Sequence, residues 1–282
     1  SMSNLLPAIS RRIPAAVTIA GSDSGAGAGI QADLKTFAAH GVYGTSVITA
    51  VTAQNTRGVQ SFAALDPGLV AAQIEAVIDD IKPAAAKTGM LANAGIVRVI
   101  VEALEHYPDL PVVIDPVANA KSGDALIDAE ALAALRSDLL PRARLITPNL
   151  PEAAALTGLR AETTDDMPRV GEALLALGVG AVVVKGGHLI DRADDLFMDG
   201  SRSEWLSAAR VITRCTHGTG CTFSAAITAN LALGHELFEA VVAAKRYLTE
   251  ALIAGYEVGD GHSPVDHFYA GTRFPTNERV IA

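Results

Sequence analysis

Short apolar runs alternate with segments of helical spacing along almost the whole chain, and no other feature of the sequence constrains its fold as strongly. Between residues 67 and 81, for instance, Val70, Ile74 and Ile78 fall on one face of a helix. Continuous apolar strands that alternate with helices are typical of a mostly parallel sheet with helices on both faces. We therefore expect an α/β fold whose strands cover residues 15–20, 46–53, 84–87, 112–115, 145–147 and 181–184.

The predicted helices cover residues 29–40, 67–81, 94–107, 129–136, 151–156, 167–177, 220–233 and 236–256. A small antiparallel pair is predicted at residues 193–198 and 204–207, because Asp199-Gly200 between them is a strong hairpin signal. No stretch resembles a linker, so we expect one domain over residues 15–282 behind a tail over residues 1–14. Ser1 ahead of Met2 is interpreted as the scar of a cleaved tag.

Composition excludes several classes of protein. Half of the 282 residues are apolar, which is too many for a disordered chain. The net charge of −9 argues against a general nucleic-acid or anionic-membrane binder, which needs a basic face. Residues 173–184 form the longest apolar run, and a bilayer span takes roughly 20 residues. No apolar segment precedes Arg11 and Arg12 as in a secretory signal, so we expect a cytoplasmic protein.

A glycine-rich turn over residues 21–29 follows the first predicted strand. Residues 27–32 match the GxGxxG/A pattern of dinucleotide sites, which also need an acidic residue roughly 20 positions further on. Between Asp33 and Asp66 there is no Asp or Glu, so this reading is disfavoured. A turn that binds the substrate through its backbone is favoured, and a purely structural turn is the alternative.

A second glycine turn, Gly218-Thr219-Gly220, runs directly into a helix of small residues that starts near Cys221. Backbone N–H groups at such a turn form an anion site, where a phosphoryl group in transfer can be held. The helix dipole is predicted to lower the pKa of the Cys221 thiol. The residues alone leave two roles open for Cys221: it activates an attacking hydroxyl, or it is a small buried side chain in a helix turn. The only other cysteine, Cys215, lies six residues away, which is not the spacing of a CxxC metal or redox pair.

Seven short motifs are spread over most of the chain. They read TIAGSD at 18–23, AGIQADLKT at 28–36, AQN at 53–55, KTGM at 87–90, ITPNLPE at 146–152, KGGH at 185–188 and HGTGC at 217–221. Together they resemble the hydroxymethylpyrimidine/phosphomethylpyrimidine kinases of thiamine biosynthesis, which belong to the ribokinase superfamily. The resemblance implies a ribokinase-like three-layer sandwich, ATP and Mg²⁺ as cofactors, and a homodimer.

The resemblance also implies catalytic roles. Most of the superfamily carries Asp after the Gly-Thr-Gly turn as the catalytic base, and this chain is similar to the pyrimidine kinases in having Cys221 there. The Gly218 and Gly220 amides would hold the transferring phosphoryl group. Nucleotide contacts are implied for Asn149, Lys185, Thr219 and Lys245, and a water-mediated Mg²⁺ site for Asp115 and Glu152. The alternatives are structural: a first-turn helix carboxylate for Glu152, a strand-end charge for Lys185 and a solvated helix face for Lys245.

The predicted substrate contacts centre on Gln54. Its amide can pair with the exocyclic amine and the adjacent ring nitrogen of an aminopyrimidine, although a solvated turn residue is the alternative. Met90 would pack on the flat ring or simply fill the core. Asp23 and Asp33 would orient the hydroxymethyl arm or the glycine turn, or in the case of Asp33 only cap local backbone. Gly21 and Val117 complete the predicted ring site.

The sequence therefore predicts ATP-dependent phosphorylation of 4-amino-5-hydroxymethyl-2-methylpyrimidine, and then of its monophosphate to the pyrophosphate. A pyridoxal kinase of the same fold is the nearest alternative, and a dinucleotide-dependent oxidoreductase and a non-catalytic sensor are more distant ones. Ala26 and Ser263 stand where many relatives have glycine, which puts substrate tolerance in question more than reaction type.

Overall fold

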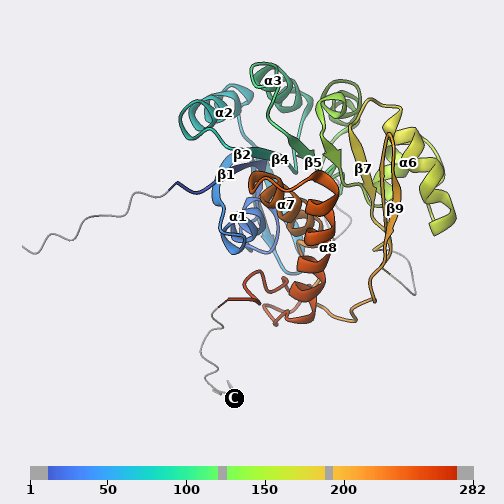
Figure 1. Ribbon diagram of the computed structural model, residues 1–282. Coiled ribbons are helices and arrows are strands. Elements are labelled where there is room, and N and C mark those ends of the chain that lie inside the picture. Colours follow the sequence, from blue (N-terminus) through green and yellow to red (C-terminus); the bar gives the residue numbers. More distant parts are fainter. Residues whose placement is uncertain (1–11, 120–125, 188–192, 272–282) are drawn as a thin grey trace, which may run out of the picture.

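The computed structural model describes residues 12–119, 126–187 and 193–271, and within them the strands form one mixed sheet in the order β3-β2-β1-β4-β5-β6-β7-β8-β9 (Figure 1). Neighbouring strands from β2 to β7 run parallel, whereas β3, β8 and β9 pair antiparallel at the two edges. The strands are β1 (Ala15–Ser22), β2 (Tyr43–Asn55), β3 (Gly58–Ala64), β4 (Ala85–Thr88), β5 (Val112–Ile114), β6 (Leu145–Ile146), β7 (Ala181–Val184), β8 (Asp195–Asp199) and β9 (Ser203–Leu206).

Helices cover both faces of this sheet (Figure 1). One face carries α2 (Pro67–Ile81), α3 (Ala94–Glu105), α4 (Ala129–Ala134), α5 (Leu150–Thr157) and α6 (Met167–Leu175). The other carries α1 (Gly29–Ala39), α7 (Thr219–Ala232) and α8 (Leu237–Ile253). Successive strand residues serve opposite layers: Val112 and Ile114 pack toward the first group, and Val113 toward the second. The predicted three-layer α/β fold is confirmed.

Most predicted elements are present with bounds shifted by a few residues. The helix predicted at residues 67–81 is α2, which begins at Pro67 behind an Asp66 cap and ends at a left-handed Lys82. The helix predicted at 129–136 instead changes after α4 into a π-helical turn, Leu135–Leu139, and a 3-10 turn, Leu140–Arg142. Strand β3 was not predicted, because Gln60 and Ser61 interrupt its apolar residues and most of its side chains are exposed.

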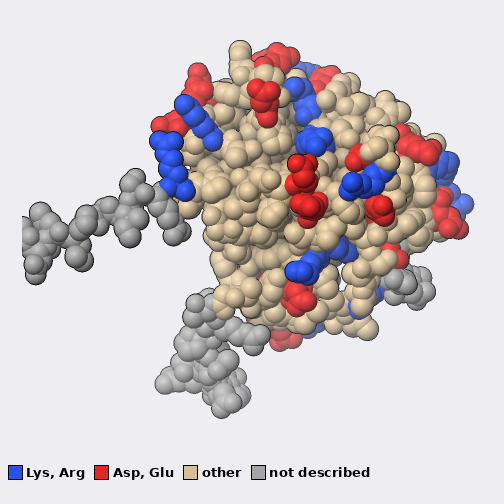
Figure 2. Space-filling model, in the orientation of Figure 1, with Lys and Arg blue, Asp and Glu red and all other residues tan. Residues whose placement is uncertain are grey.

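Charged side chains of both signs lie on the face of the molecule that Figure 2 shows. Figure 2 shows Lys and Arg side chains lying beside Asp and Glu on this face rather than gathered into one basic patch. Among the described residues, no helix is long and apolar enough to cross a membrane. The domain bounds, a tail over residues 1–14 and one domain over residues 15–282, remain a prediction, and most of that tail lies outside the described residues.

Candidate active site

The carboxyl ends of the parallel strands carry the motif residues. β5 leads into Asp115, β6 leads to the start of α5 at Asn149, and β7 leads into Lys185. Ligands of open α/β sheets bind at this edge. Two surface hollows that are lined by Asp79 and His106 lie beside α2 and α3, and neither contains a residue of these motifs.

The start of α7 meets this edge of the sheet. Gly218 holds a left-handed backbone (φ 76°) just before α7, and a methyl group there would lie 1.8 Å from the carbonyl oxygen of Gly27. A methyl group on Gly220 would come within 3.3 Å of Lys185 Nζ and 3.5 Å of Asp115 Oδ2. The glycine at 218 therefore lets the start of α7 approach the first glycine turn, and the glycine at 220 lets it approach Lys185. The N–H groups of a helix start and a lysine both favour an anion, so this arrangement is suited to a phosphate group.

Asp115 and Lys185 form the charged centre of the edge. Lys185 Nζ lies 3.5 Å from Asp115 Oδ1, and Asp115 also accepts hydrogen bonds from Thr147 Oγ1 at 3.2 Å and Ser224 Oγ at 3.4 Å. Burial would lower the pKa of Lys185, but the charges of Asp115, Glu152 and Asp195 outweigh burial and raise it. Lys185 is therefore held as a cation at neutral pH, next to the amino end of α7.

Cys221 lies in the first turn of α7 with a partly exposed side chain. The predicted lowering of its thiol pKa is wrong. Protein atoms surround the sulfur, and this desolvation raises the pKa of Cys221 to about 12, although the charge of Lys87 and the N–H of Gly29 act in the opposite direction. Desolvation disfavours the charged thiolate and is the largest cause of this rise. At neutral pH the side chain is a thiol.

A buried ion pair connects strand β4 to helix α1. Lys87 Nζ donates to Asp33 Oδ1 at 2.7 Å, Thr18 Oγ1 donates to Asp33 Oδ2 at 2.6 Å, and the lysine and carboxylate side chains are both 0% exposed. Burial would lower the pKa of Lys87, but the Asp33 carboxylate outweighs burial and raises it. The structure thus places Asp33 below the surface with both oxygens engaged. Sequence reasoning gave Lys87 no role, although it begins the KTGM motif and is a lysine inside an apolar strand.

Asn149 and Glu152 form a capping box at the start of α5. Glu152 Oε2 accepts from the Asn149 N–H at 2.8 Å, and Asn149 Oδ1 accepts from the Glu152 N–H at 2.8 Å. Burial raises the pKa of Glu152 to about 7, Lys185 opposes the rise and Asp115 adds to it. The structural role considered for Glu152, a carboxylate in the first turn of a helix, is therefore present. The same carboxyl group is also close enough to interact electrostatically with Asp115 and Lys185.

The donor set suits a magnesium ion that keeps most of its water. In the part of the chain that the structure describes, no three His, Cys, Asp or Glu side chains gather as a metal cage. Mg²⁺ is usually held by one or two carboxylates together with substrate phosphates. Asp115 and Glu152, which lie near Lys185 and the start of α7, fit that pattern.

Lys245 does not lie on a solvated face. Its Nζ donates to the Ala193 carbonyl and to Asp195 Oδ2, both at 2.6 Å. Asp195 Oδ1 in turn accepts from the N–H of Gly186, which directly follows Lys185. The lysine thus fixes the turn after β7 from α8. Asp195 was not singled out in the sequence, and His188 of the KGGH motif lies outside the described residues.

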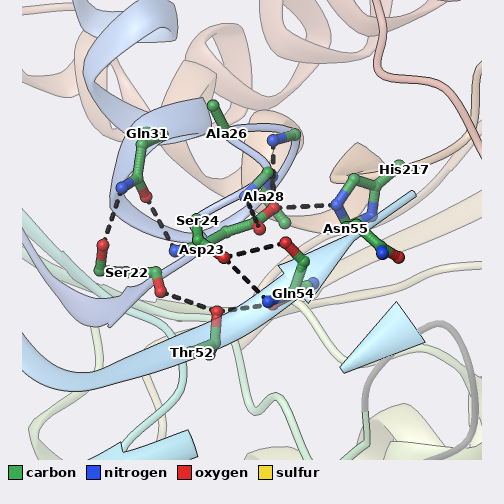
Figure 3. Close-up of polar contacts among 12 residues, drawn as sticks. Ser22, Asp23, Ser24, Ala26, Ala28, Gln31, Thr52, Gln54, Asn55 and His217 are labelled. Atoms are coloured by element: carbon green, nitrogen blue, oxygen red, sulfur yellow. Dashed lines mark hydrogen bonds and ion pairs between the residues drawn. The ribbon is translucent and has the colours of Figure 1, made fainter. Parts of the chain in front are cut away.

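The first glycine turn wraps around Asp23 (Figure 3). Asp23 accepts from the N–H groups of Gly25 at 2.8 Å, Gly27 at 3.0 Å and Ala28 at 2.8 Å. Of the two roles considered for Asp23, orienting the glycine turn is therefore the one that the structure displays. Ala26 sits at the left-handed tip of this turn (φ 62°), the backbone region in which glycine is unstrained.

The remaining substrate candidates lie around the same turn. Gln54 is half-buried at the end of β2, and its Oε1 accepts from Thr52 Oγ1 at 3.2 Å. Met90 is buried against Gly21, where a methyl group would come within 2.9 Å of its sulfur. Val117 is half-buried beyond β5 and packs against the core. The second departure from the family pattern, Ser263, is buried and closes a loop through hydrogen bonds with the backbone of Val258.

Comparison with known proteins decides between the readings that the sequence left open. A model of the protein family described as phosphomethylpyrimidine kinase matches residues 23–266. The chain belongs to that family. A hydroxymethylpyrimidine/phosphomethylpyrimidine kinase from Streptomyces coelicolor is 51% identical over 257 residues, which cover 91% of this chain and 95% of the relative. This family member is therefore a phosphotransferase, and the dinucleotide-dependent alternative is not supported.

Solved structures of relatives agree with this family. The phosphomethylpyrimidine kinase from Clostridium difficile superimposes with a TM-score of 0.76 at 48% identity, covering 85% of this chain and 99% of that one. An ADP complex of a Bacillus subtilis pyridoxal kinase superimposes with a TM-score of 0.86 at 40% identity, covering 92% of this chain and 99% of that one. The ribokinase-like fold expected from the motifs is confirmed.

Proposed function

We propose that the protein transfers the γ-phosphate of ATP to the hydroxymethyl oxygen of an aminopyrimidine, and in a second round to the resulting monophosphate. One observation carries this proposal: the glycine turn around Asp23 touches the start of α7, as a methyl group on Gly218 would overlap the Gly27 carbonyl oxygen. An acceptor bound at the first turn is thereby next to a phosphate held at the second. Phosphoryl transfer depends mainly on such positioning and on charge stabilisation.

The residues of this chain divide the work between them. The N–H groups at the start of α7 and the Lys185 ammonium neutralise charge on the transferring group, and Asn149 and Thr219 orient the nucleotide. Cys221 contacts the acceptor hydroxyl as a thiol, because its pKa is raised to about 12. A loose transition state needs little deprotonation of the hydroxyl before attack, so the thiol only orients it. As the new O–P bond forms and the bond to ADP breaks, the hydroxyl proton passes to an oxygen of the transferred phosphoryl group and from there to water.

Magnesium fits beside these groups. Asp115 and Glu152 would hold Mg²⁺ through its water molecules, and the ion would neutralise charge on the β- and γ-phosphates of ATP. Asn149 keeps Glu152 in place through the capping box. Lys245 acts indirectly, because it holds Asp195, which in turn accepts a hydrogen bond from the N–H of Gly186 next to Lys185.

Recognition of the ring rests on Gln54. Its Nε2 and Oε1 offer a donor and an acceptor at the end of β2, which match the amine and ring nitrogen of an aminopyrimidine. The likeness to a pyridoxal kinase at a TM-score of 0.86 makes pyridoxal the second candidate substrate. A pyridine aldehyde lacks the exocyclic amine, so it forfeits one of the two hydrogen bonds to Gln54.

The deciding experiment measures ATP consumption with Mg²⁺ against hydroxymethylpyrimidine, its monophosphate and pyridoxal, with products identified by mass. Turnover of both pyrimidines with little pyridoxal phosphorylation is expected. The control is Cys221→Ala, for which a loss in kcat of roughly 10²-fold is expected. Turnover of pyridoxal alone would contradict the proposal and the role of Gln54.

We also propose that the protein is a homodimer. Val51, Ala53 and Ala63 are exposed on one face of the β2–β3 pair, where Val51 lies opposite Ala63. An apolar sheet face at the edge of the molecule is suited to a second copy of the chain. Sedimentation equilibrium should give twice the mass of 29.1 kDa, and Val51→Asp should shift it toward the monomer. A monomeric wild type would refute this assembly.

A further inference from the structure

A buried histidine joins the two glycine turns. His217, which directly precedes Gly218, places its Nε2 2.9 Å from Asp23 Oδ2 (Figure 3). The two side chains are 8% and 2% exposed. Burial would raise the pKa of Asp23, but the hydrogen bonds from His217 and from the Ala28 and Gly25 amides outweigh burial and lower it. Asp23 is therefore an ionised acceptor, which requires that His217 donate its Nε2–H.

The two glycine turns are in close contact around this hydrogen bond. A methyl group on Gly27 would come within 2.1 Å of His217 Cδ2, and one on Gly218 within 1.8 Å of the Gly27 carbonyl oxygen. The backbone of His217 is held as well, because its N–H donates to the Ser263 carbonyl at 3.0 Å. The imidazole is thus a rigid spacer between a turn near the start of the chain and another near its end.

Ser24, the residue after Asp23, connects the first glycine turn to the predicted ring site. Ser24 Oγ donates to the Gln54 carbonyl at 2.9 Å and accepts from the Gln54 N–H at 2.8 Å. Two adjacent residues of the first glycine turn therefore contact both parts of the candidate site. Ser24 contacts the end of β2 that carries Gln54. Asp23 contacts His217, which directly precedes the second glycine turn.

We infer that His217 is a positioning residue for phosphoryl transfer. By donating Nε2–H to Asp23, it fixes the distance between the acceptor turn at Gly25–Ala28 and the phosphoryl turn at Gly218–Cys221. The inference rests on the proposed function, because it assigns the acceptor to one turn and the phosphoryl group to the other. A misplacement of about 1 Å in such an arrangement costs about 10²-fold in rate.

Three variants test this role. His217→Ala removes the donor, His217→Gln places an amide N–H near the position of Nε2, and His217→Asn carries its amide nearer to Nδ1. The matched control is His235→Ala, because His235 is exposed beyond the far end of α7. For each variant, kcat, the KM of ATP, the KM of the acceptor and the thermal midpoint are measured.

His217→Ala should lower kcat about 10²-fold while the KM of ATP changes less than about threefold, since the nucleotide contacts remain. The kcat of His217→Gln should be at least about tenfold higher than that of His217→Ala, and it should also be higher than that of His217→Asn. His235→Ala should behave as the wild type. Equal activity of the Gln and Asn variants, or a rise in both KM values with kcat unchanged, would overturn the role. The Gln-to-Asn ratio decides the question even if the Ala variant fails to fold.

A double variant separates this role from general damage to the turn. If His217 acts through Asp23, then His217→Gln should lower kcat far less in an Asp23→Asn background than in the wild type. Independent, multiplicative losses would refute the coupling. Failure of the proposed function is seen separately, as absence of pyrimidine turnover by the wild-type protein. If the wild type phosphorylates only pyridoxal, the same ratios are measured with that acceptor.

Discussion

Replacing Glu152 by glutamine should stabilise the protein at alkaline pH while impairing its activity. The glutamine Oε1 can still accept the hydrogen bond from the Asn149 N–H, so the capping box of α5 is kept. What is lost is a carboxyl group whose pKa burial raises from 4.5 to about 7. An unfolded chain ionises this group near pH 4.5, so the folded state has to take up a proton or bury a charge.

The magnitude follows from the two pKa values. Because the folded pKa is the higher one, the folded protein binds more protons between pH 4.5 and 7, and its stability falls as the pH rises through that window. The pKa of Glu152 is about 2.5 higher in the folded protein than in the unfolded chain. This difference lowers the free energy of unfolding of the wild type by about 3 kcal/mol at pH 8, about 2 kcal/mol at pH 6 and less than about 1 kcal/mol at pH 5. The variant, which does not titrate, should be more stable than the wild type by these amounts.

Urea unfolding followed by far-UV circular dichroism at pH 5, 6 and 8 measures this difference. The matched control is Glu239→Gln, because Glu239 also lies in the first turn of a helix, α8, but is exposed. Its effect should stay within about 0.5 kcal/mol at every pH. The reasoning is refuted if the gain at Glu152 is independent of pH or if the wild type is the more stable protein at pH 8. If Glu152 holds Mg²⁺ as proposed, loss of its charge should also lower kcat/KM in the same variant.

Three further outcomes are expected. Alkylation of Cys221 by iodoacetamide, located by mass mapping, should still be accelerating at pH 10, since its pKa is raised to about 12; a plateau near the pKa of free cysteine, about 8.5, would contradict this. Gln54→Ala should raise the pyrimidine KM more than the ATP KM in steady-state assays, and equal changes would argue against a ring contact. Lys87→Met should destabilise the fold by about 3–5 kcal/mol in urea, because Asp33 keeps its burial but loses its cation; a loss below about 1 kcal/mol would show that the pair is not ionised.

The layers of the fold were predictable because the apolar pattern is strong wherever a strand is buried on both faces. Residues 181–184 and 112–114, for example, are uninterrupted apolar runs and form β7 and β5. Strand β3 carries no such signal, because it is an exposed edge strand that pairs only with β2. Its existence depends on the partner strand and the Thr56-Arg57 turn, which local composition does not encode.

The members of the candidate site were mostly predictable, but their electrostatics and partners were not. Glycine turns and polar residues that follow strands are visible in the sequence, and they mark Asp23, Asp115 and Lys185 as candidates. The pKa of Cys221 was predicted in the wrong direction, because helix position is readable from sequence while burial is not. Pairs such as Asp23 with His217 or Asp195 with Lys245 depend on which distant segments the topology brings together.

The covering of β1 and β4 by α7 has a consequence for synthesis on the ribosome. Ala16, Phe37 and Ala85 near the start of the chain pack against Ala225 and Ala229 of α7. This apolar surface is translated early and stays uncovered until α7 emerges, on the order of ten seconds later at about 5–20 residues per second. The helix that covers it also carries Cys221, so a single packing step buries this surface and brings Cys221 to the carboxyl ends of the strands.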